Sequence, residues 1–165
     1  IAQCLVGSEM CIRDRNDAIA QYVRQNMNLL IGERTAEKIK WDIGSASTDA
    51  AAEMGSTEVR GRDLVTGLPK TMEVSAKDVS VALQDVVASI IDAIKGTLEE
   101  TSPEIAADVI DHGIVLTGGG ALLKHLPDVI ADATKVPVFI ANDPLDCVAT
   151  GTGESLKSID VMKKK

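Results

Sequence analysis

The stretch GIVLTGGGALLKHL, residues Gly113–Leu126, decides the fold of this chain. A short apolar run, IVL, enters three consecutive glycines, and an apolar run with helical spacing leaves them. Glycine adopts backbone angles that other residues avoid, and it has no Cβ to keep a ligand at a distance. A helix after such a turn offers unpaired N–H groups and the positive end of its dipole. From these glycines alone, a nucleotide-binding turn and a tight strand-to-helix turn without a ligand are equally good interpretations.

The common phosphate-binding motifs do not decide between these interpretations. Both GxxxxGK[ST] and GxGxxG are absent from the sequence. The stretch GTGES at 151–155 resembles part of such a loop, but it lies between helical segments, which favours a packing role. The choice therefore depends on the rest of the chain.

Composition excludes several classes of function. The 165 residues are 45% hydrophobic and 25% charged, which is typical of about one soluble globular domain. The net charge is −8 and no dense basic stripe is present, so we expect no nucleic-acid partner. No apolar run approaches the roughly 18 residues of a membrane span. The three cysteines are scattered and no Cys/His cluster occurs, so neither a zinc site nor a disulfide framework is expected.

The first half of the chain predicts two helices and a hairpin. Apolar residues at spacings of three and four predict a helix from Asn16 that ends by Gly32. A second short helix follows, with Thr35 as its cap and Gly44 as its end, and then a surface loop. The alternating stretch TEVRGRDLVTGLPKTMEVS, residues 57–75, predicts a β-hairpin with a glycine-containing turn.

The second half predicts a long helix followed by alternating strands and helices. Ser75 and Asp78 match a capping box that opens an amphipathic helix to about Glu100. The helix after Ser102 is followed by the strand IVL, the helical stretches ALLKHL and DVIADAT, the strand VPVFIA and a last helix from Asp143. This strand–helix–strand–helix order predicts a mixed α/β fold with a parallel sheet.

Four stretches, in order and with matching spacing, resemble the MreB family, the bacterial actin-like, rod-shape-determining proteins. They are LIGERTAEKIKWDIGSA, EVRGRDLVTGLPKT, GIVLTGGGALLKHL and DPLDCVATGTGESL. The resemblance covers most of residues 16–160. It implies the α/β fold of the actin-like ATPases, which is ribonuclease H-like. The chain would contain only the second-half domain of that fold, and this domain would include an α+β subdomain.

The resemblance also implies a domain organisation. Residues 16–97 would form the smaller subdomain of the second actin-like domain, and residues 98–165 the larger nucleotide-binding subdomain plus a C-terminal helix. The opening IAQCLVGSEMCIRDR, residues 1–15, resembles translated sequencing-adapter or vector DNA, so we expect a non-native or disordered start. In the family both phosphate-binding loops precede the segment that matches Asn16. The chain therefore resembles roughly the C-terminal half of a longer protein.

Two segments match the family's nucleotide site, which implies ATP as the cofactor, with Mg held through the missing half. One is the glycine loop, which we define as residues 117–121; the other is a helix that covers the adenine and ribose. Their residues are Thr117, Gly118, Gly119, Gly120 and Ala121 in the loop, and Glu37, Lys38, Ile39 and Lys40 in the helix. Without the resemblance, we would interpret Glu37 and Lys40 as a surface ion pair that contributes less than about 1 kcal/mol to stability. No catalytic residue and no metal ligand is assigned.

The function expected from the resemblance is that of an ATP-binding, filament-forming protein that directs cell shape and cell-wall synthesis. Its partners would be further copies of itself and membrane proteins of cell-shape and cell-wall synthesis, with cytoplasmic filaments associated with the membrane. The longer protein would be an ATPase, whereas this chain alone would be inactive. Two alternatives remain at this point: a sugar or acetate kinase of the same fold superfamily, and a non-enzymatic interaction module.

Overall fold

The computed structural model of the chain describes the backbone of residues 9–157 and the side chains of residues 13–157. The elements of the first part are α1 (Glu9–Met27), β1 (Leu29–Leu30), α2 (Glu33–Ile43), α3 (Thr48–Ala51), β2 (Ser56–Asp63), β3 (Pro69–Ser75) and α4 (Ala76–Glu99). The elements of the second part are α5 (Pro103–His112), β4 (Ile114–Leu116), the 3₁₀ helix η1 (Gly119–Leu122), α6 (Leu126–Thr134), β5 (Val138–Ile140) and α7 (Cys147–Lys157).

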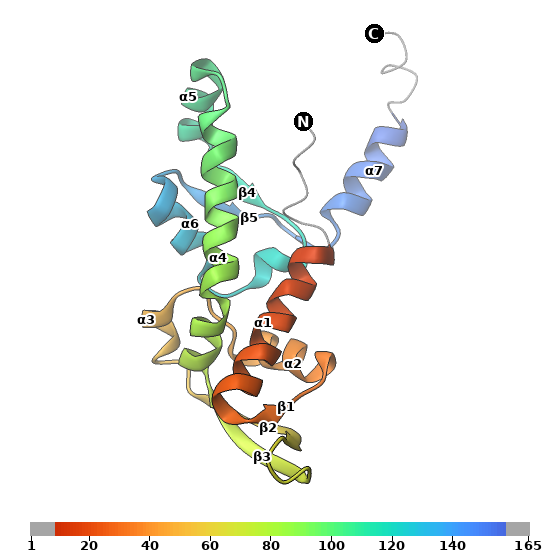
Figure 1. The fold of residues 1–165 in the computed structure, drawn as a ribbon. Helices are drawn as coiled ribbons and strands as arrows, with labels where there is room; N and C mark the ends of the chain where they lie inside the picture. Colours follow the sequence, from red (N-terminus) through yellow and green to blue (C-terminus); the bar gives the residue numbers. More distant parts are fainter. Residues whose placement is uncertain (1–8, 158–165) are drawn as a thin grey trace.

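The long helix α4 is the axis of an elongated molecule (Figure 1). The hairpin of β2 and β3 lies at one end of α4, and α5 lies at the other end. Helices α1 and α2 and the short helix α3 surround its first half, whereas β4, β5 and α6 lie beside its second half. Helix α7 projects away from these layers, toward the C-terminus.

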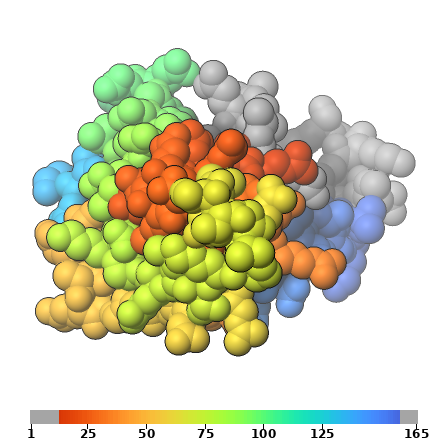
Figure 2. All heavy atoms as spheres, turned by 60° about the horizontal axis from the view of Figure 1, so that its bottom comes forward, coloured from red at the N-terminus to blue at the C-terminus, as the bar shows by residue number. Residues whose placement is uncertain are grey.

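Two small sheets confirm the predicted hairpin and the predicted parallel pair. The antiparallel sheet has the order β1-β2-β3, with Val59 opposite Met72 in the hairpin. In the other sheet β4 and β5 are parallel, with Val115 opposite Phe139. Figure 2 looks at the end of the molecule formed by the hairpin, which comes forward in yellow beside α1 in red. The hairpin thus extends the first part of the fold away from the parallel pair.

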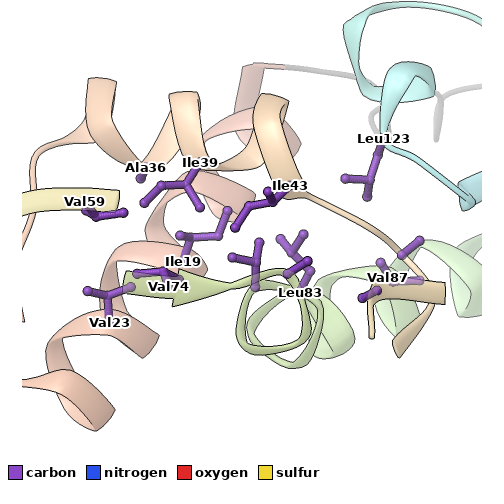
Figure 3. Close-up of a cluster of buried hydrophobic side chains, with 14 of the residues drawn as sticks. Ile19, Val23, Ala36, Ile39, Ile43, Val59, Val74, Leu83, Val87 and Leu123 are labelled. Carbon is purple, nitrogen blue, oxygen red and sulfur yellow. The ribbon is translucent and has the colours of Figure 1, made fainter. Parts of the chain in front are cut away.

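One aliphatic cluster forms the core of this chain, of which only 2% is aromatic. Figure 3 shows its side chains converging from α1, α2, the hairpin and α4, and the largest of them are fully buried. The labelled members are Ile19, Val23, Ala36, Ile39, Ile43, Val59, Val74, Leu83, Val87 and Leu123. Burying one such Val, Leu or Ile side chain contributes about 1.5–3 kcal/mol. Because Leu123 follows the glycine loop, the same core also anchors that loop.

The junction between the hairpin and α4 is fixed by the predicted capping box. The Asp78 N–H donates to Ser75 Oγ at 3.2 Å, and the Ser75 N–H donates to Asp78 Oδ2 at 3.3 Å. The hydroxyl of Tyr22, on α1, donates to Asp78 Oδ1 at 3.2 Å. The cap therefore sets both the start of α4 and the position of α1 against it.

Three predicted element starts are wrong. Helix α1 begins at Glu9 instead of Asn16, so it crosses the boundary expected at residue 15; residues 1–8 lie outside the described residues. Helix α2 begins directly after Gly32, whose carbonyl accepts from the N–H groups of both Thr35 and Ala36. The last helix begins at Cys147 rather than Asp143, because Asp143 has a left-handed φ of 49° that does not extend a helix.

Two further segments differ from the prediction. The expected surface loop after Gly44 contains α3, which Ser47 caps by accepting from the Ala50 N–H. The stretch ALLKHL is not one α-helix, because η1 ends at Leu122 and His125 adopts a left-handed φ of 59°. This break turns the chain before α6 and brings Lys124 next to the segment that follows α2.

Replacing Leu83 with alanine should lower the free energy of unfolding by about 2–5 kcal/mol, because it removes a fully buried side chain from the centre of the cluster. Val81 lies on the same helix and is 40% exposed, so Val81→Ala should cost only about 0.5 kcal/mol. Urea unfolding of both variants measures the difference. Equal losses would show that the core does not depend on this face of α4.

Candidate functional site

The glycine loop connects β4 to η1 through a backbone that requires glycine. Gly118 has a φ of 81° and a ψ of 171°, a conformation that essentially only glycine adopts. Its N–H donates to the carbonyl of Pro144 at 2.7 Å, and nothing lies within 4 Å of the position that a Cβ would take. The loop is therefore held from behind and open in front.

The next two glycines border different surroundings. A Cβ on Gly119 would meet only Leu145 Cδ2, at 3.4 Å, which is ordinary contact. A Cβ on Gly120 would lie 3.0 Å from two nitrogens of the Arg15 guanidinium, which donates to the Gly120 carbonyl at 3.2 Å. Gly120 thus allows α1 to pack closely against the loop, whereas Gly119 borders only Leu145.

Lys40 brings α2 next to this loop. Its Nζ donates to Asn16 Oδ1 at 2.9 Å and lies 5.9 Å from the centroid of the Trp41 ring. A narrow hollow, which we call the Lys40 hollow, lies between α2 and the loop. It is lined by Arg15, Lys40, Trp41, Gly119, Leu122 and Leu123. The two segments assigned to the nucleotide by resemblance therefore meet at this point.

The surroundings of Lys40 alter its protonation. Burial lowers the pKa of the Lys40 amine below its ordinary value of 10.5. The carboxylate of Glu37 opposes this shift and raises the pKa, whereas the charge of Arg15 lowers it further. The amine thus holds its proton less tightly than an exposed lysine does, and Glu37 offsets part of that loss.

A set of hydrogen bonds fixes the distance between α2 and the loop segment. The Lys124 Nζ donates to the carbonyl of Asp42 at 2.8 Å, and the Lys124 carbonyl accepts from the Ala46 N–H at 2.9 Å. At the adjacent residues, the Oγ of the fully buried Ser45 lies 3.1 Å from His125 Nδ1. These contacts, which we call the Lys124 junction, join the two predicted subdomains directly beside the Lys40 hollow.

The structure gives the predicted site residues different positions. Gly119 and Lys40 line the Lys40 hollow, and Gly118 and Gly120 flank Gly119 in the loop. Glu37 and Thr117 are exposed, whereas Ile39 and Ala121 are core residues with 2% and 3% of their surface exposed. Lys38 is exposed and lines, together with Ile39, a separate groove between α2 and β2.

Sequence reasoning missed three residues that shape the site. Arg15 lies in the segment expected to be foreign, yet it is only 5% exposed and contacts the loop. Leu145 is distant in sequence and approaches Gly119 only through the fold. Trp41 offered a signal, because the single tryptophan of the chain directly follows Lys40.

Sequence comparison identifies one family over nearly the whole chain. The family described as MreB/Mbl protein matches residues 10–164. The cell shape-determining protein Mbl of Bacillus subtilis (strain 168) is 48% identical over 147 residues, which are 89% of this chain and 44% of that protein. This chain thus spans less than half the length of that relative.

Solved structures give the same result for the fold. MreB5 of Spiroplasma citri, bound to ADP, is similar with a TM-score of 0.85 and 34% identity, over 93% of this chain and 46% of that one. The MamK double helical filament has a TM-score of 0.64 at 20% identity, over 79% and 39% of the two chains, and supports the shared fold alone. The expected fold class, part of an actin-like ATPase domain, is confirmed. Among the described helices, none has both the length and the apolar character needed to cross a membrane.

Replacing Glu37 with glutamine should lower the pKa of Lys40 further, because it removes the nearby carboxylate that raises this pKa. NMR titration of the Lys40 side chain measures the shift. Glu33→Gln, one turn earlier on α2, is the matched control and should leave the Lys40 pKa unchanged. A rise of the Lys40 pKa in the Glu37 variant would show that the two side chains do not interact as described.

Proposed function

The chain belongs to the MreB/Mbl family, and we propose that it supplies one wall of the ATP site in a filament-forming bacterial actin homologue that directs cell shape and cell-wall synthesis. Mbl of Bacillus subtilis is described as cell shape-determining, and the solved MreB5 of Spiroplasma citri is bound to ADP. The activity proposed is that of a protein of their length. The match over residues 10–164 favours this function over a sugar or acetate kinase and over an interaction module without a nucleotide.

The meeting of Gly119 and Lys40 at the Lys40 hollow is the observation that carries this proposal. Gly118 presents backbone without a side chain toward open space, and a Cβ on Gly119 would meet only Leu145, so a flat group can approach the loop closely. Across the hollow, α2 offers the Lys40 amine and its apolar stem beside the Trp41 ring. This arrangement suits the adenosine part of a nucleotide better than its phosphates.

Each predicted residue then has a role in holding adenosine. The loop residues from Thr117 to Ala121 contribute backbone, and the exposed Glu37 carboxylate accepts hydrogen bonds from ribose hydroxyls. Lys40 packs against the base with its stem. Lys38 and Ile39 belong to the same helix, but their side chains line the groove between α2 and β2. Their proposed role is therefore to position α2 rather than to contact the nucleotide.

Adenosine contacts bind the substrate and the transition state about equally, and such uniform binding does not accelerate a reaction. Phosphoryl transfer depends on groups that position the phosphates and neutralise their charge, Mg among them. Among the residues that the structure describes, no group of three His, Cys, Asp or Glu side chains is placed to hold a metal ion. We therefore assign binding to this chain and phosphate chemistry to the remainder of a family-length protein.

We also propose that the family-length protein assembles with further copies of itself, and that its filaments lie in the cytoplasm, at the membrane, with cell-wall synthesis proteins as partners. The solved MamK filament supports self-association on this fold only as an analogy.

Gly119→Val should weaken nucleotide binding by the chain without lowering its stability, because the added side chain takes space beside the Lys40 hollow and meets Leu145 only at ordinary contact distance. Gly96→Val is the control, since Gly96 lies on α4 with nothing within 4 Å of its Cβ position. Titration with a fluorescent ADP analogue, with unlabelled adenosine as competitor, measures the affinity. Equal affinities of the two folded variants would show that the glycine loop has only a packing role.

The 165-residue chain should release no phosphate from ATP above background, because its proposed contacts are all to adenosine. A phosphate-release assay should compare the turnover of the 165-residue chain with that of the protein expressed from its complete gene. Equal turnover by the two proteins would contradict the proposed division between binding and chemistry.

The protein expressed from its complete gene should sediment as filaments when ATP is present. High-speed sedimentation with ATP, and without nucleotide as the control, is the measurement. A protein that remains in the supernatant at every concentration would rule out the proposed assembly.

A further inference from the structure

Strand β2 has one edge that is paired along its length and one edge that is mostly open. Strand β3 pairs with the seven residues Ser56–Arg62, whereas β1 pairs only with Arg62 and Asp63. No further strand joins this sheet within residues 9–157. The edge of β2 from residue 56 to residue 60 that faces away from β3 therefore lacks a strand partner in the described part of the chain.

Backbone hydrogen bonds determine which groups lie on this open edge. The Asp63 N–H donates to the Leu68 carbonyl, and the Ala76 N–H donates to the Gly55 carbonyl, both at 2.9 Å. The odd-numbered residues of β2 thus bond toward β3. Because bonding alternates along an antiparallel strand, the even-numbered residues present their N–H and C=O groups to the open edge. These residues are Ser56, Glu58 and Arg60.

An open groove runs beside this edge, between β2 and α2; we call it the β2 groove. Its cationic side chains are Arg34, Lys38 and Arg60, and its carboxylates are Asp42 and Glu58. The groove therefore carries a surplus of positive charge on a chain whose net charge is −8. Free backbone donors and acceptors next to cationic side chains are what an extended acidic peptide requires.

We propose that the β2 groove binds an extended segment of another protein, which adds to β2 as a strand and carries two acidic residues separated by one. Arg34 and Lys38 lie one helical turn apart, a rise of about 6 Å along α2. Alternate residues of a strand point to the same side and lie about 6.7 Å apart. A Glu-x-Glu segment in the groove thus matches the spacing of the two cations.

The sequence favours a different protein over a second copy of these 165 residues as the source of this segment. Of the 25 acidic residues in the chain, no two are separated by a single residue. Charged side chains at a sheet edge also discourage aggregation, and Glu58 and Arg60 fit that simpler role. A binding experiment separates the two roles, because protection against aggregation requires no affinity for a defined peptide.

The probe is a fluorescein-labelled peptide, TVEVEVT, with blocked ends, titrated against the 165-residue chain by fluorescence anisotropy. The control peptide TVVEEVT has the same composition but places its two carboxylates on opposite faces of a strand. We expect saturable binding of the first peptide and severalfold weaker binding of the second. Hydrogen exchange should show new protection of the Glu58 and Arg60 amides only when the first peptide is bound.

Two variants at one position test the strand pairing itself. Glu58→Pro removes an N–H that faces the open edge and leaves the bonds to β3 in place, a change that edge strands tolerate. It should weaken binding about tenfold, whereas Glu58→Ala, which keeps the N–H, should not. Arg34→Glu should weaken binding and reduce its dependence on salt.

Three results would each overturn the proposal: no saturable binding of TVEVEVT, equal affinities for the two peptides, or equal binding by the folded proline and alanine variants. Circular dichroism shows whether the proline variant folds. If it does not, the hydrogen-exchange result on the unaltered chain decides, and unprotected Glu58 and Arg60 amides would exclude strand addition.

Discussion

One aliphatic cluster holds both sides of the candidate nucleotide site in place. The buried faces of α1, α2 and α4 form half of this cluster, and Leu123, Leu126 and Ile130 enter it from the segment after the glycine loop. Because protein cores are close-packed, these side chains leave little freedom for the loop to shift against α2. The position of Gly119 opposite Lys40 thus follows from packing more than from any contact within the site. A nucleotide wall made of bare backbone depends on such support, since its own residues have almost no side chains with which to anchor it.

Burial is distributed unevenly over the chain. Helices α5 and α7 have no buried residues, and large apolar side chains on β4, β5 and the segment into α7 are exposed, namely Val115, Phe139, Ile140, Leu145 and Val148. Segments with few buried apolar contacts open locally at low free-energy cost. The second part of the chain is therefore the less stable one when it stands alone. Its exposed apolar surface is of the kind that a neighbouring domain or another copy covers.

Local sequence signals predicted the elements that depend on local chemistry. The hairpin, the Ser75–Asp78 capping box, the long helix and the parallel pair all follow from patterns within a few residues. The left-handed His125 and the left-handed Asp143 do not, because tertiary contacts impose them against helical propensity. The residues of the candidate site also divide into those that the sequence indicates and those that only the fold brings together. The glycine loop is visible in the sequence, the residues of α2 came only from family resemblance, and Arg15 and Leu145 reach the loop only through the fold.

The Lys124 junction has a consequence for how the site responds to a ligand. Its hydrogen bonds tie the end of α2 to the segment after the glycine loop and so restrain the separation of the two surfaces. Binding of a ligand that contacts both surfaces, as proposed for adenosine, would therefore cost less conformational entropy than binding to surfaces that must first be ordered.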